Sequence, residues 1–375
     1  MPCLSLIDMT GLYIHIPFCE KKCSYCDFVS FGGRQTCLPS YLDALKNEAL
    51  RYRGKSIDTV FIGGGTPSLM TQWQTADLMT FLRQNFSIAS DAEITIECNP
   101  ASLTYSKLLE YRAVGINRIS VGAQSLSDEV LSDIGRCHTA AQLEEAVNSV
   151  KRAGFENFNL DLIFALPGQT LEAWKKTLLQ ALSYNPAHIS CYSLTIEPDT
   201  PLGRDVLSGR LRLPEEETER AMYSAVGEIL AQCGIFQYEI SNYAKPGREC
   251  RHNLNYWLCG EYIGLGCAAH SYYEGNRYRN TQNLEKYIMQ KDIMRDIHPL
   301  TEEDRMNERI MLGLRLNRGM DIVAFNKDFG VDFFKKYGKA IKKNQELDLI
   351  AANERFIRLT ERGRDFADTV TLDFI

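Results

Sequence analysis

The sequence of 375 residues lacks any apolar run near the roughly 18 residues that a membrane-spanning helix needs. Its start has no basic segment, and Asp8 interrupts the only apolar stretch of residues 1–10, which argues against a secretory signal. It also lacks an excess of positive charge, since its formal net charge is -6, and it has no internal repeat or low-complexity linker. These absences argue against fibrous, secreted and membrane-spanning proteins. We expect a cytoplasmic globular protein that does not bind nucleic acid.

Twelve cysteines are more than a chain of this size needs for structure, and in a reducing compartment they indicate metal or redox chemistry. Most of them stand alone, as small buried hydrophobic residues do. The exception is the group Cys19, Cys23 and Cys26, which has the spacing C-x3-C-x2-C after a predicted strand. Three thiolates on such a loop can hold three irons of a four-iron cluster and leave the fourth iron open. A zinc site is the alternative, but structural zinc prefers four ligands with paired C-x2-C spacing, and the chain has no second pair.

Short β-rich runs alternate with amphipathic segments between residues 12 and 195, which is typical of βα units around a parallel sheet. The predicted strands are Leu12–Ile16, Thr59–Ile62, Glu93–Glu97, Arg118–Val121, Asn157–Ile163 and His188–Leu194. Apolar residues at helical spacing, such as Leu143, Val147 and Val150, predict the helices between them. Six repeats favour an α/β fold with a partial or full TIM-like barrel, although the period alone does not separate a barrel from an open sheet.

The alternation of strands and helices ends after Pro201. We predict a helix over 214–233, which begins with an acidic turn, then an aromatic and glycine-rich region over 237–278. A further helix is predicted from Thr301 to about Gly319.

The C-terminal tail predicts a small module. Two short strands over 347–359 meet about Ala352 and Asn353, and a helix near 360–366 follows. Helices followed by a hairpin are typical of a winged-helix-like module. Lysines between 335 and 343 are interpreted as a solvated helix face, not as a nucleic-acid patch.

A glycine run follows the second predicted strand, in Gly63-Gly64-Gly65-Thr66. Residues without side chains let the backbone approach a ligand closely, although a plain tight turn is the simpler alternative. Further polar residues stand at or just after the ends of later strands, where a barrel places its active site. They are Glu97, Gln124, Arg136 and Asp161.

The cysteine spacing resembles that of the radical S-adenosylmethionine (radical SAM) family. This resemblance implies a barrel fold, a [4Fe-4S] cluster held by the three cysteines, and SAM bound to the open iron. The glycine run and the strand-end residues further resemble the SAM contacts of the oxygen-independent coproporphyrinogen dehydrogenase family. The implied SAM contacts are Tyr13, Gly64, Gly65, Thr66, Glu97, Gln124, Arg136 and Asp161.

Two branches of that family compete. The dehydrogenase proper carries a fourth cysteine two residues after the third and a long N-terminal extension, whereas this chain has Phe28 and only 18 residues before Cys19. Both features are similar to those of the other branch, the heme chaperones. The motif HNxxYW at residues 252–257 is also similar to a motif of that branch. In that motif the resemblance implies a heme region formed by His252, Asn253, Tyr256 and Trp257.

The alternative for this motif is a hydrogen-bonded structural cluster. His270 is a second candidate histidine for heme, and a thiolate from Cys250, Cys259 or Cys267 could also serve.

The resemblance thus implies a heme chaperone that carries a [4Fe-4S] cluster, SAM and heme and delivers heme to acceptor apoproteins. It divides the chain into a barrel core over 1–205, a barrel-completing and tetrapyrrole-handling region over 206–300, and a C-terminal module of the dehydrogenase type over 301–375. Respiratory acceptors, peripheral membrane association through them and a homodimer are compatible with it. A coproporphyrinogen dehydrogenase and a heme-degrading radical methyltransferase are the alternatives, and whether radical chemistry occurs stays open.

Overall fold

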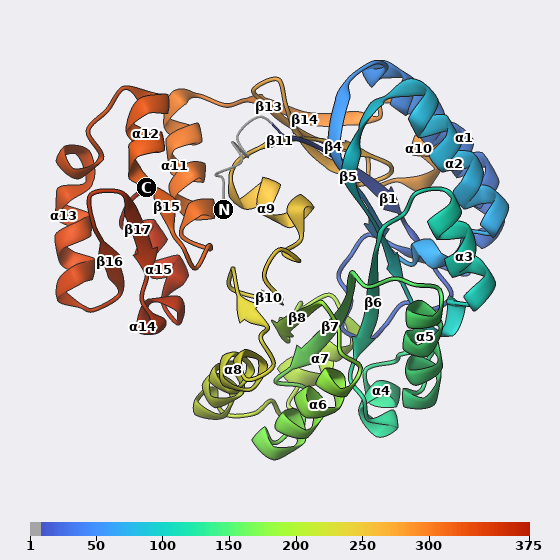
Figure 1. Ribbon diagram of the computed structural model, residues 1–375, viewed down its shortest axis with the longest axis horizontal. Helices are drawn as coiled ribbons and strands as arrows, with labels where there is room; N and C mark the ends of the chain where they lie inside the picture. Colours follow the sequence, from blue (N-terminus) through green and yellow to red (C-terminus); the bar gives the residue numbers. More distant parts are fainter. Residues whose placement is uncertain (1–8) are drawn as a thin grey trace.

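A computed structural model describes residues 9–375, so most of the segment on which the secretory-signal expectation rests lies outside the described residues. Its main feature is a 12-stranded sheet with the order β14-β13-β12-β11-β1-β4-β5-β6-β7-β8-β10-β9 (Figure 1). Between residues 9 and 375, no helix is both long enough and apolar enough to cross a membrane.

Six neighbouring parallel strands form the centre of the sheet, and they are the six that the sequence predicts. They are β1 (Thr10–Ile16), β4 (Ser56–Gly64), β5 (Ser87–Cys98), β6 (Arg118–Gln124), β7 (Phe158–Phe164) and β8 (His188–Ser193). The structure begins β4 and β5 earlier than predicted because their first residues pair with each other, Ser56 with Ser87. The outer face is covered by α1 (Leu38–Ala49), α2 (Gln72–Asn85), α3 (Tyr105–Ala113), α5 (Ala140–Arg152) and α6 (Leu171–Ser183).

Strands beyond the predicted set extend both sides of this centre. On one side β11 (Glu261–Leu265) pairs parallel with β1, and antiparallel strands β12 (His270–Tyr273), β13 (Asn276–Asn280) and β14 (Met294–Pro299) follow. On the other side β10 (Asn242–Ala244) and β9 (Phe236–Gln237) are antiparallel to their neighbours. Since β14 and β9 are the two ends of the strand order, the barrel is partial.

The two faces of the central strands differ in chemistry. Alternate residues such as Leu12, Ile62 and Val121 are fully buried and belong to the main hydrophobic core. Their neighbours point to the opposite face, and there the strands carry polar residues such as Thr95 and Arg118. The inside of the barrel is therefore polar, unlike the aliphatic layers that fill a closed TIM barrel.

Shorter elements connect these parts. They are β2 (Phe18–Cys19), β3 (Phe31–Gly32), α4 (Asp128–Asp133), α7 (Pro201–Leu207), α8 (Glu216–Ala231), α9 (Arg251–Trp257) and α10 (Leu284–Ile288). The predicted helix over 214–233 corresponds to α8. Helix α9 contacts β1, β4 and β11 of the barrel and also α11 of the C-terminal module, so it lies between the two.

The C-terminal module has its own hydrophobic core, formed within 306–374. Its elements are α11 (Glu302–Gly313), β15 (Met320–Asp321), α12 (Ile322–Phe329), α13 (Phe333–Glu346), β16 (Ile350–Ala352), β17 (Phe356–Leu359), α14 (Glu361–Arg364) and α15 (Ala367–Leu372). This order, with the three-stranded sheet β15-β17-β16, is that of a winged helix, as predicted.

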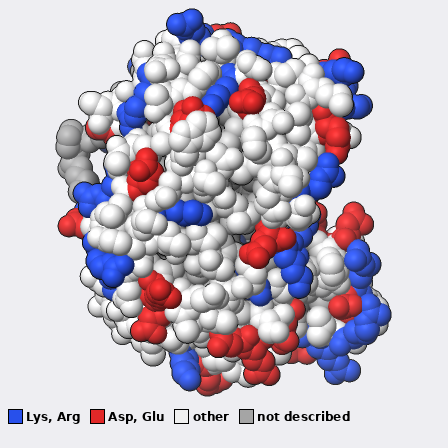
Figure 2. Space-filling model, turned by 90° about the vertical axis from the view of Figure 1, so that its right-hand side faces the viewer, with Lys and Arg blue, Asp and Glu red and all other residues white. Residues whose placement is uncertain are grey.

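Two details of this module bear on the sequence-based expectations. Helix α11 ends at Gly313, earlier than predicted, because Leu316 forms a β-bridge with Glu239 of the barrel region. Helix α13 buries Phe333, Tyr337 and Ile341 and leaves its lysines exposed, which confirms the solvated face. On the face shown in Figure 2, positive and negative side chains are interspersed among uncharged ones.

Candidate functional site

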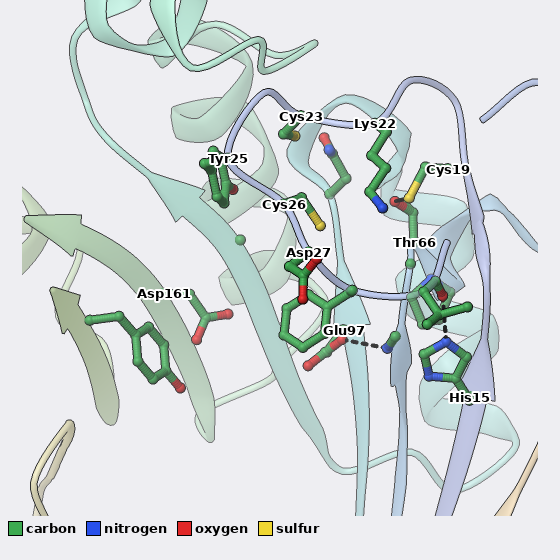
Figure 3. Close-up of a pocket in the computed structure, with 18 of the residues that line it drawn as sticks. His15, Cys19, Lys22, Cys23, Tyr25, Cys26, Asp27, Thr66, Glu97 and Asp161 are labelled. Carbon is green, nitrogen blue, oxygen red and sulfur yellow. Dashed lines mark hydrogen bonds between the residues drawn. The ribbon is translucent and has the colours of Figure 1, made fainter. Parts of the chain in front are cut away.

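The three clustered cysteines lie on a loop that leaves the end of β1 and returns at β3 (Figure 3). The loop is closed at its base by a hydrogen bond from the Phe31 amide to the Pro17 carbonyl, 2.7 Å long. Its middle is held by Ser24, which donates its amide to the Ile134 carbonyl at 3.1 Å and accepts from the Leu202 amide at 2.9 Å. Helices α4 and α7 thus fix the loop, and all three thiols line the same cavity. The three are Cys19, Cys23 and Cys26.

The glycine run at the end of β4 packs against the backbone that leads into this loop. The Gly65 amide donates to the Ile16 carbonyl at 2.9 Å, and the Thr66 amide donates to the Phe18 carbonyl at 2.8 Å. A Cβ atom on Gly65 would lie 2.7 Å from the Phe18 oxygen, so no other residue fits there without movement. Thr66 also donates its hydroxyl to Cys19 Sγ at 3.7 Å. The run therefore couples β4 to the cysteine loop.

Two half-buried carboxyl groups face the cavity from neighbouring parts of the sheet. Glu97 accepts a hydrogen bond from the Gly64 amide at 3.0 Å (Figure 3). Burial raises its pKa to about 8, the nearby Asp161 adds to that effect, and the Gly64 hydrogen bond opposes it. Asp161 accepts from Ser120 at 2.9 Å and Asn159 at 2.8 Å, and burial raises its pKa too. A cationic group placed between the two carboxyls would favour their charged forms.

Arg136 brings a positive charge beside the cysteine loop. Its guanidinium donates to Cys23 Sγ at 3.6 Å and to the Gly122 carbonyl at 2.7 Å, while its Nε is buried without a partner in the described part of the chain. Gln124, which ends β6, has a positive φ of 62° and lines the cavity next to this arginine.

His15 is a site residue that the sequence reasoning missed. Its Nε2 lies 2.9 Å from the Val29 carbonyl, which only accepts, so Nε2 carries the proton. Burial lowers the pKa of His15, and its neutral Nδ1 then accepts from the Tyr13 hydroxyl at 2.8 Å. His15 thereby links the cysteine loop to the phenol of Tyr13. Its position two residues after Tyr13 on a predicted strand, and therefore on the same face, is the signal that could have indicated it.

These groups surround one cavity of about 1140 Å³. Every residue that the sequence analysis assigned to SAM lines this cavity. They are Tyr13, Gly64, Gly65, Thr66, Glu97, Gln124, Arg136 and Asp161. Phe28 lines it as well, and this residue is 68% exposed.

The donor set fits a [4Fe-4S] cluster with SAM. Three thiols from one loop supply three ligands, which leaves an iron for a small-molecule ligand. The side-chain-free edge at Gly64 and Gly65 and the carboxyl of Glu97 suit the amino group of an amino acid. The unpartnered Nε of Arg136 provides a further donor beside the thiols.

The HNxxYW motif forms α9, and its residues divide between the barrel interior and the cavity. His252 is fully buried, with Nδ1 2.8 Å from the Thr59 hydroxyl and Nε2 2.8 Å from the Tyr256 hydroxyl. Its ring stacks on Phe61 at 5.3 Å, and burial lowers its pKa to about 3. Both ring nitrogens are thus engaged in hydrogen bonds. Tyr256 and Trp257 line the cavity, whereas His252 and Asn253 do not.

The three thiols considered for heme also lie off the cavity. Burial raises the pKa of Cys250 to about 12, of Cys259 to about 11 and of Cys267 to about 12, so all three are neutral thiols at pH 7. Cys250 donates to Glu93, and Cys267 donates to the Thr281 carbonyl.

A second wall of the cavity comes from β11, β13, the start of β12, α9 and α11, and we call it the C-terminal wall. Its residues are Tyr256, Trp257, Tyr262, Ala268, His270, Arg277, Gln282, Glu308, Met311 and Leu312. Only part of this wall could be predicted from the sequence, because the wall joins segments up to 56 positions apart whose contact depends on strand pairing and on the docking of α11.

Comparisons with known proteins agree with this geometry. Residues 13–181 match the family model described as Radical SAM superfamily, and residues 300–366 match the model described as HemN C-terminal domain. The chain is 38% identical to the protein named heme chaperone HemW of Bacillus subtilis over 95% of this chain and 96% of that protein. It is also 38% identical to the HemW protein of Escherichia coli, over 84% of this chain and 85% of that protein.

Among solved structures, the chain resembles one titled coproporphyrinogen III oxidase (HemN) from Escherichia coli, a radical SAM enzyme. The TM-score is 0.86 and the sequence identity 25%, over 98% of this chain and 90% of that chain. The match includes the C-terminal module as well as the partial barrel, and it confirms the predicted fold class.

Proposed function

The chain belongs to the heme chaperone HemW family of radical SAM proteins, and on this premise we propose that it binds heme and delivers it to acceptor apoproteins. In this proposal Cys19, Cys23 and Cys26 hold a [4Fe-4S] cluster. SAM lies beside it, contacted by the eight residues that share the cavity with the cysteines. Heme binds against the C-terminal wall.

The observation that supports the proposal is the continuity of the cavity. One space of about 1140 Å³ extends from the cysteine loop to the aromatic C-terminal wall. That volume exceeds the roughly 300–1,000 Å³ typical of a site for one small molecule. The cavity therefore offers room for a second, flat and largely apolar ligand beside SAM.

The chain's own side chains prepare the cluster end for a cationic amino acid. The Gly64 amide fixes the Glu97 carboxyl, and Asp161 is held by Ser120 and Asn159, so both acceptors are ordered before the ligand arrives. Such preorganised groups cost little reorganisation on binding. The guanidinium of Arg136 lies beside Cys23 and donates a hydrogen bond to its sulfur. When bound, the cluster would supply one-electron chemistry to the sulfonium of SAM.

A second candidate is oxidative decarboxylation of coproporphyrinogen III, because the whole chain resembles the solved coproporphyrinogen III oxidase. Phe28 weighs against it, since this side chain stands at the cavity where the dehydrogenase branch has its fourth cysteine. A heme-degrading methyltransferase is the third alternative.

The test starts from protein reconstituted without oxygen and supplied with SAM and a reductant. Separate samples receive coproporphyrinogen III, heme alone, and heme followed by an apo-cytochrome b. We expect no decarboxylated product, no loss of heme, and transfer of intact heme to the cytochrome faster than from albumin. A decarboxylated porphyrinogen would support the dehydrogenase, and disappearance of the heme spectrum would support the methyltransferase.

The finer aspects of this function are part of the same proposal. We place the protein in the cytoplasm, with respiratory apoproteins at the membrane among its acceptors, and as a homodimer once the cluster is present. Light scattering on the apoprotein and on the reconstituted protein tests the dimer, and co-sedimentation with membranes that contain heme-free acceptors tests the association.

A further inference from the structure

The six histidines of the chain differ in their freedom to bind a metal. His252 and His188 have both ring nitrogens engaged, His252 with Thr59 and Tyr256, and His188 with Asn159 and Tyr238. His15 is engaged with Tyr13 and Val29.

Within residues 9–375, none of the three remaining histidines has such a pair of partners. His138 and His298 do not line the cavity, and His298 lies on the surface beside Asp304. His270 lines the cavity, and neither of its ring nitrogens has a hydrogen-bond partner within residues 9–375. It is thus the one histidine of the described chain that combines an accessible imidazole with a place on the cavity.

From this we propose that His270 is the axial ligand through which the protein holds the iron of heme. The inference rests on the proposed heme-binding function and deepens it by naming the ligand and its position. His270 begins β12 and pairs with Arg279 of β13, while Tyr272 pairs with Arg277. Residues directly opposite each other in antiparallel strands, and residues two apart, share one face. The imidazole therefore lies on the same face of the hairpin as the Arg277 guanidinium.

Arg277 gives that face a cation suited to a carboxylated porphyrin. Its guanidinium donates to both carboxylate oxygens of Glu308, at 2.5 and 2.8 Å, and to the Tyr262 hydroxyl at 2.9 Å. These bonds use three of its five N–H groups, which leaves two for a further carboxylate. The ring of Tyr272 lies 4.8 Å below the guanidinium. A propionate at this point would place the macrocycle along the C-terminal wall, with Trp257, Met311 and Leu312 as apolar contacts.

The electrostatic surroundings keep His270 in the form that binds iron. Partial burial and the neighbouring Arg279 and Arg277 lower its pKa, and Asp296 only partly opposes them. The imidazole is therefore neutral at pH 7, and its lone pair is available to a metal. Two phenols of the C-terminal wall are less suited, because burial raises the pKa of Tyr256 and of Tyr262 and neither of them ionises at pH 7.

The experiment titrates hemin into the reconstituted full-length protein and records visible absorption and electron paramagnetic resonance spectra. The variants are His270→Ala, His270→Cys and, as a matched control, His298→Ala, whose side chain lies on the surface outside the cavity. Because the His270 side chain makes no hydrogen bond to any residue between 9 and 375, we expect its removal to leave the fold intact, which circular dichroism verifies.

We expect wild type and His298→Ala to show histidine-ligated heme. His270→Ala loses that signature, binds hemin at least about tenfold more weakly, and regains the spectrum when imidazole is added. His270→Cys shows the spectrum of thiolate-ligated heme.

If wild type binds hemin and His270→Ala keeps its spectrum and affinity, the ligand assignment is refuted while the chaperone function stands. If wild type itself does not bind hemin, the proposed function fails and the assignment fails with it.

Discussion

Replacement of Gly65 by alanine tests how tightly the glycine run holds the cysteine loop. A Cβ atom there would lie 2.7 Å from the Phe18 oxygen, 2.9 Å from the Ile16 oxygen and 2.9 Å from the Phe18 nitrogen. All three are backbone atoms, so no side-chain rotation relieves the contact. Since an extra methyl group in a packed site costs about 1–3 kcal/mol, we expect Gly65→Ala to lower the free energy of unfolding of the apoprotein by that amount.

The matched control is Gly227→Ala, in the middle of α8, where an added Cβ meets nothing within 4 Å. Alanine is the better helix former by about 0.5–1 kcal/mol, so this variant should be more stable than wild type. The same substitution should thus lower the free energy of unfolding at position 65 and raise it at position 227. Urea denaturation followed by circular dichroism measures the stability of each.

The functional consequence follows from the hydrogen bonds of Gly65 and Thr66 to Ile16 and Phe18. Movement of Phe18 displaces Cys19, so Gly65→Ala should bind SAM at least about tenfold more weakly after reconstitution, measured by calorimetry. If Gly65→Ala were as stable as Gly227→Ala and bound SAM like wild type, the close approach of the two backbones would be refuted.

Three further predictions concern single side chains. Cys23→Ala should fold but fail to develop the thiolate-to-iron absorption on reconstitution, and a variant that keeps it would contradict the ligand assignment. Because the pKa of Glu97 rises from 4.5 to about 8 on folding, the folded apoprotein binds the extra proton between pH 5 and 8, and its stability falls as the pH rises. Glu97→Gln should remove up to about 1.4 kcal/mol per pH unit from that dependence. Urea denaturation at several pH values between 5 and 8 measures it. Equal slopes of unfolding free energy against pH for wild type and Glu97→Gln would refute the raised pKa. Glu48→Ala leaves the buried donors of Gly266, Asn280 and Tyr287 unpaired and should cost about 3–5 kcal/mol in urea denaturation, with Glu48→Gln less affected.

The central sheet could be predicted because each parallel strand carries its signal locally. Apolar residues such as Leu12 and Ile14 alternate with other types over a few positions, and turn residues bound each run. The strands that leave the barrel partial carry no such signal. β11 pairs with β1 from about 250 positions further along the chain, and β9 and β10 have only two or three residues each.

The residues that we propose as SAM contacts were predictable from the family resemblance and, for several of them, from positions at strand ends, and all of them line the cavity. The environment of His252 could not be predicted from the sequence, because its partners Thr59 and Phe61 come from a strand almost 200 positions earlier. A local motif shows that a histidine stands beside aromatic residues, but not which of its atoms are already engaged. The same limit applies to His270, because only the pairing of β12 with β13 shows that its imidazole has no hydrogen-bond partner in the described part of the chain.

The two separate hydrophobic cores have a mechanical consequence for the cavity. One core holds the barrel, with residues as late as Ile293, and the other holds the module that contributes α11 to the C-terminal wall. The wall is joined across them by polar contacts, including Arg277 with Glu308 and Arg309 with the Leu258 carbonyl. If the C-terminal module moved relative to the barrel and changed the width of the cavity, these hydrogen bonds would break. Each core would stay packed within its own unit. The entrance and exit of a large rigid ligand would be limited by these few bonds and not by the stability of either folded unit.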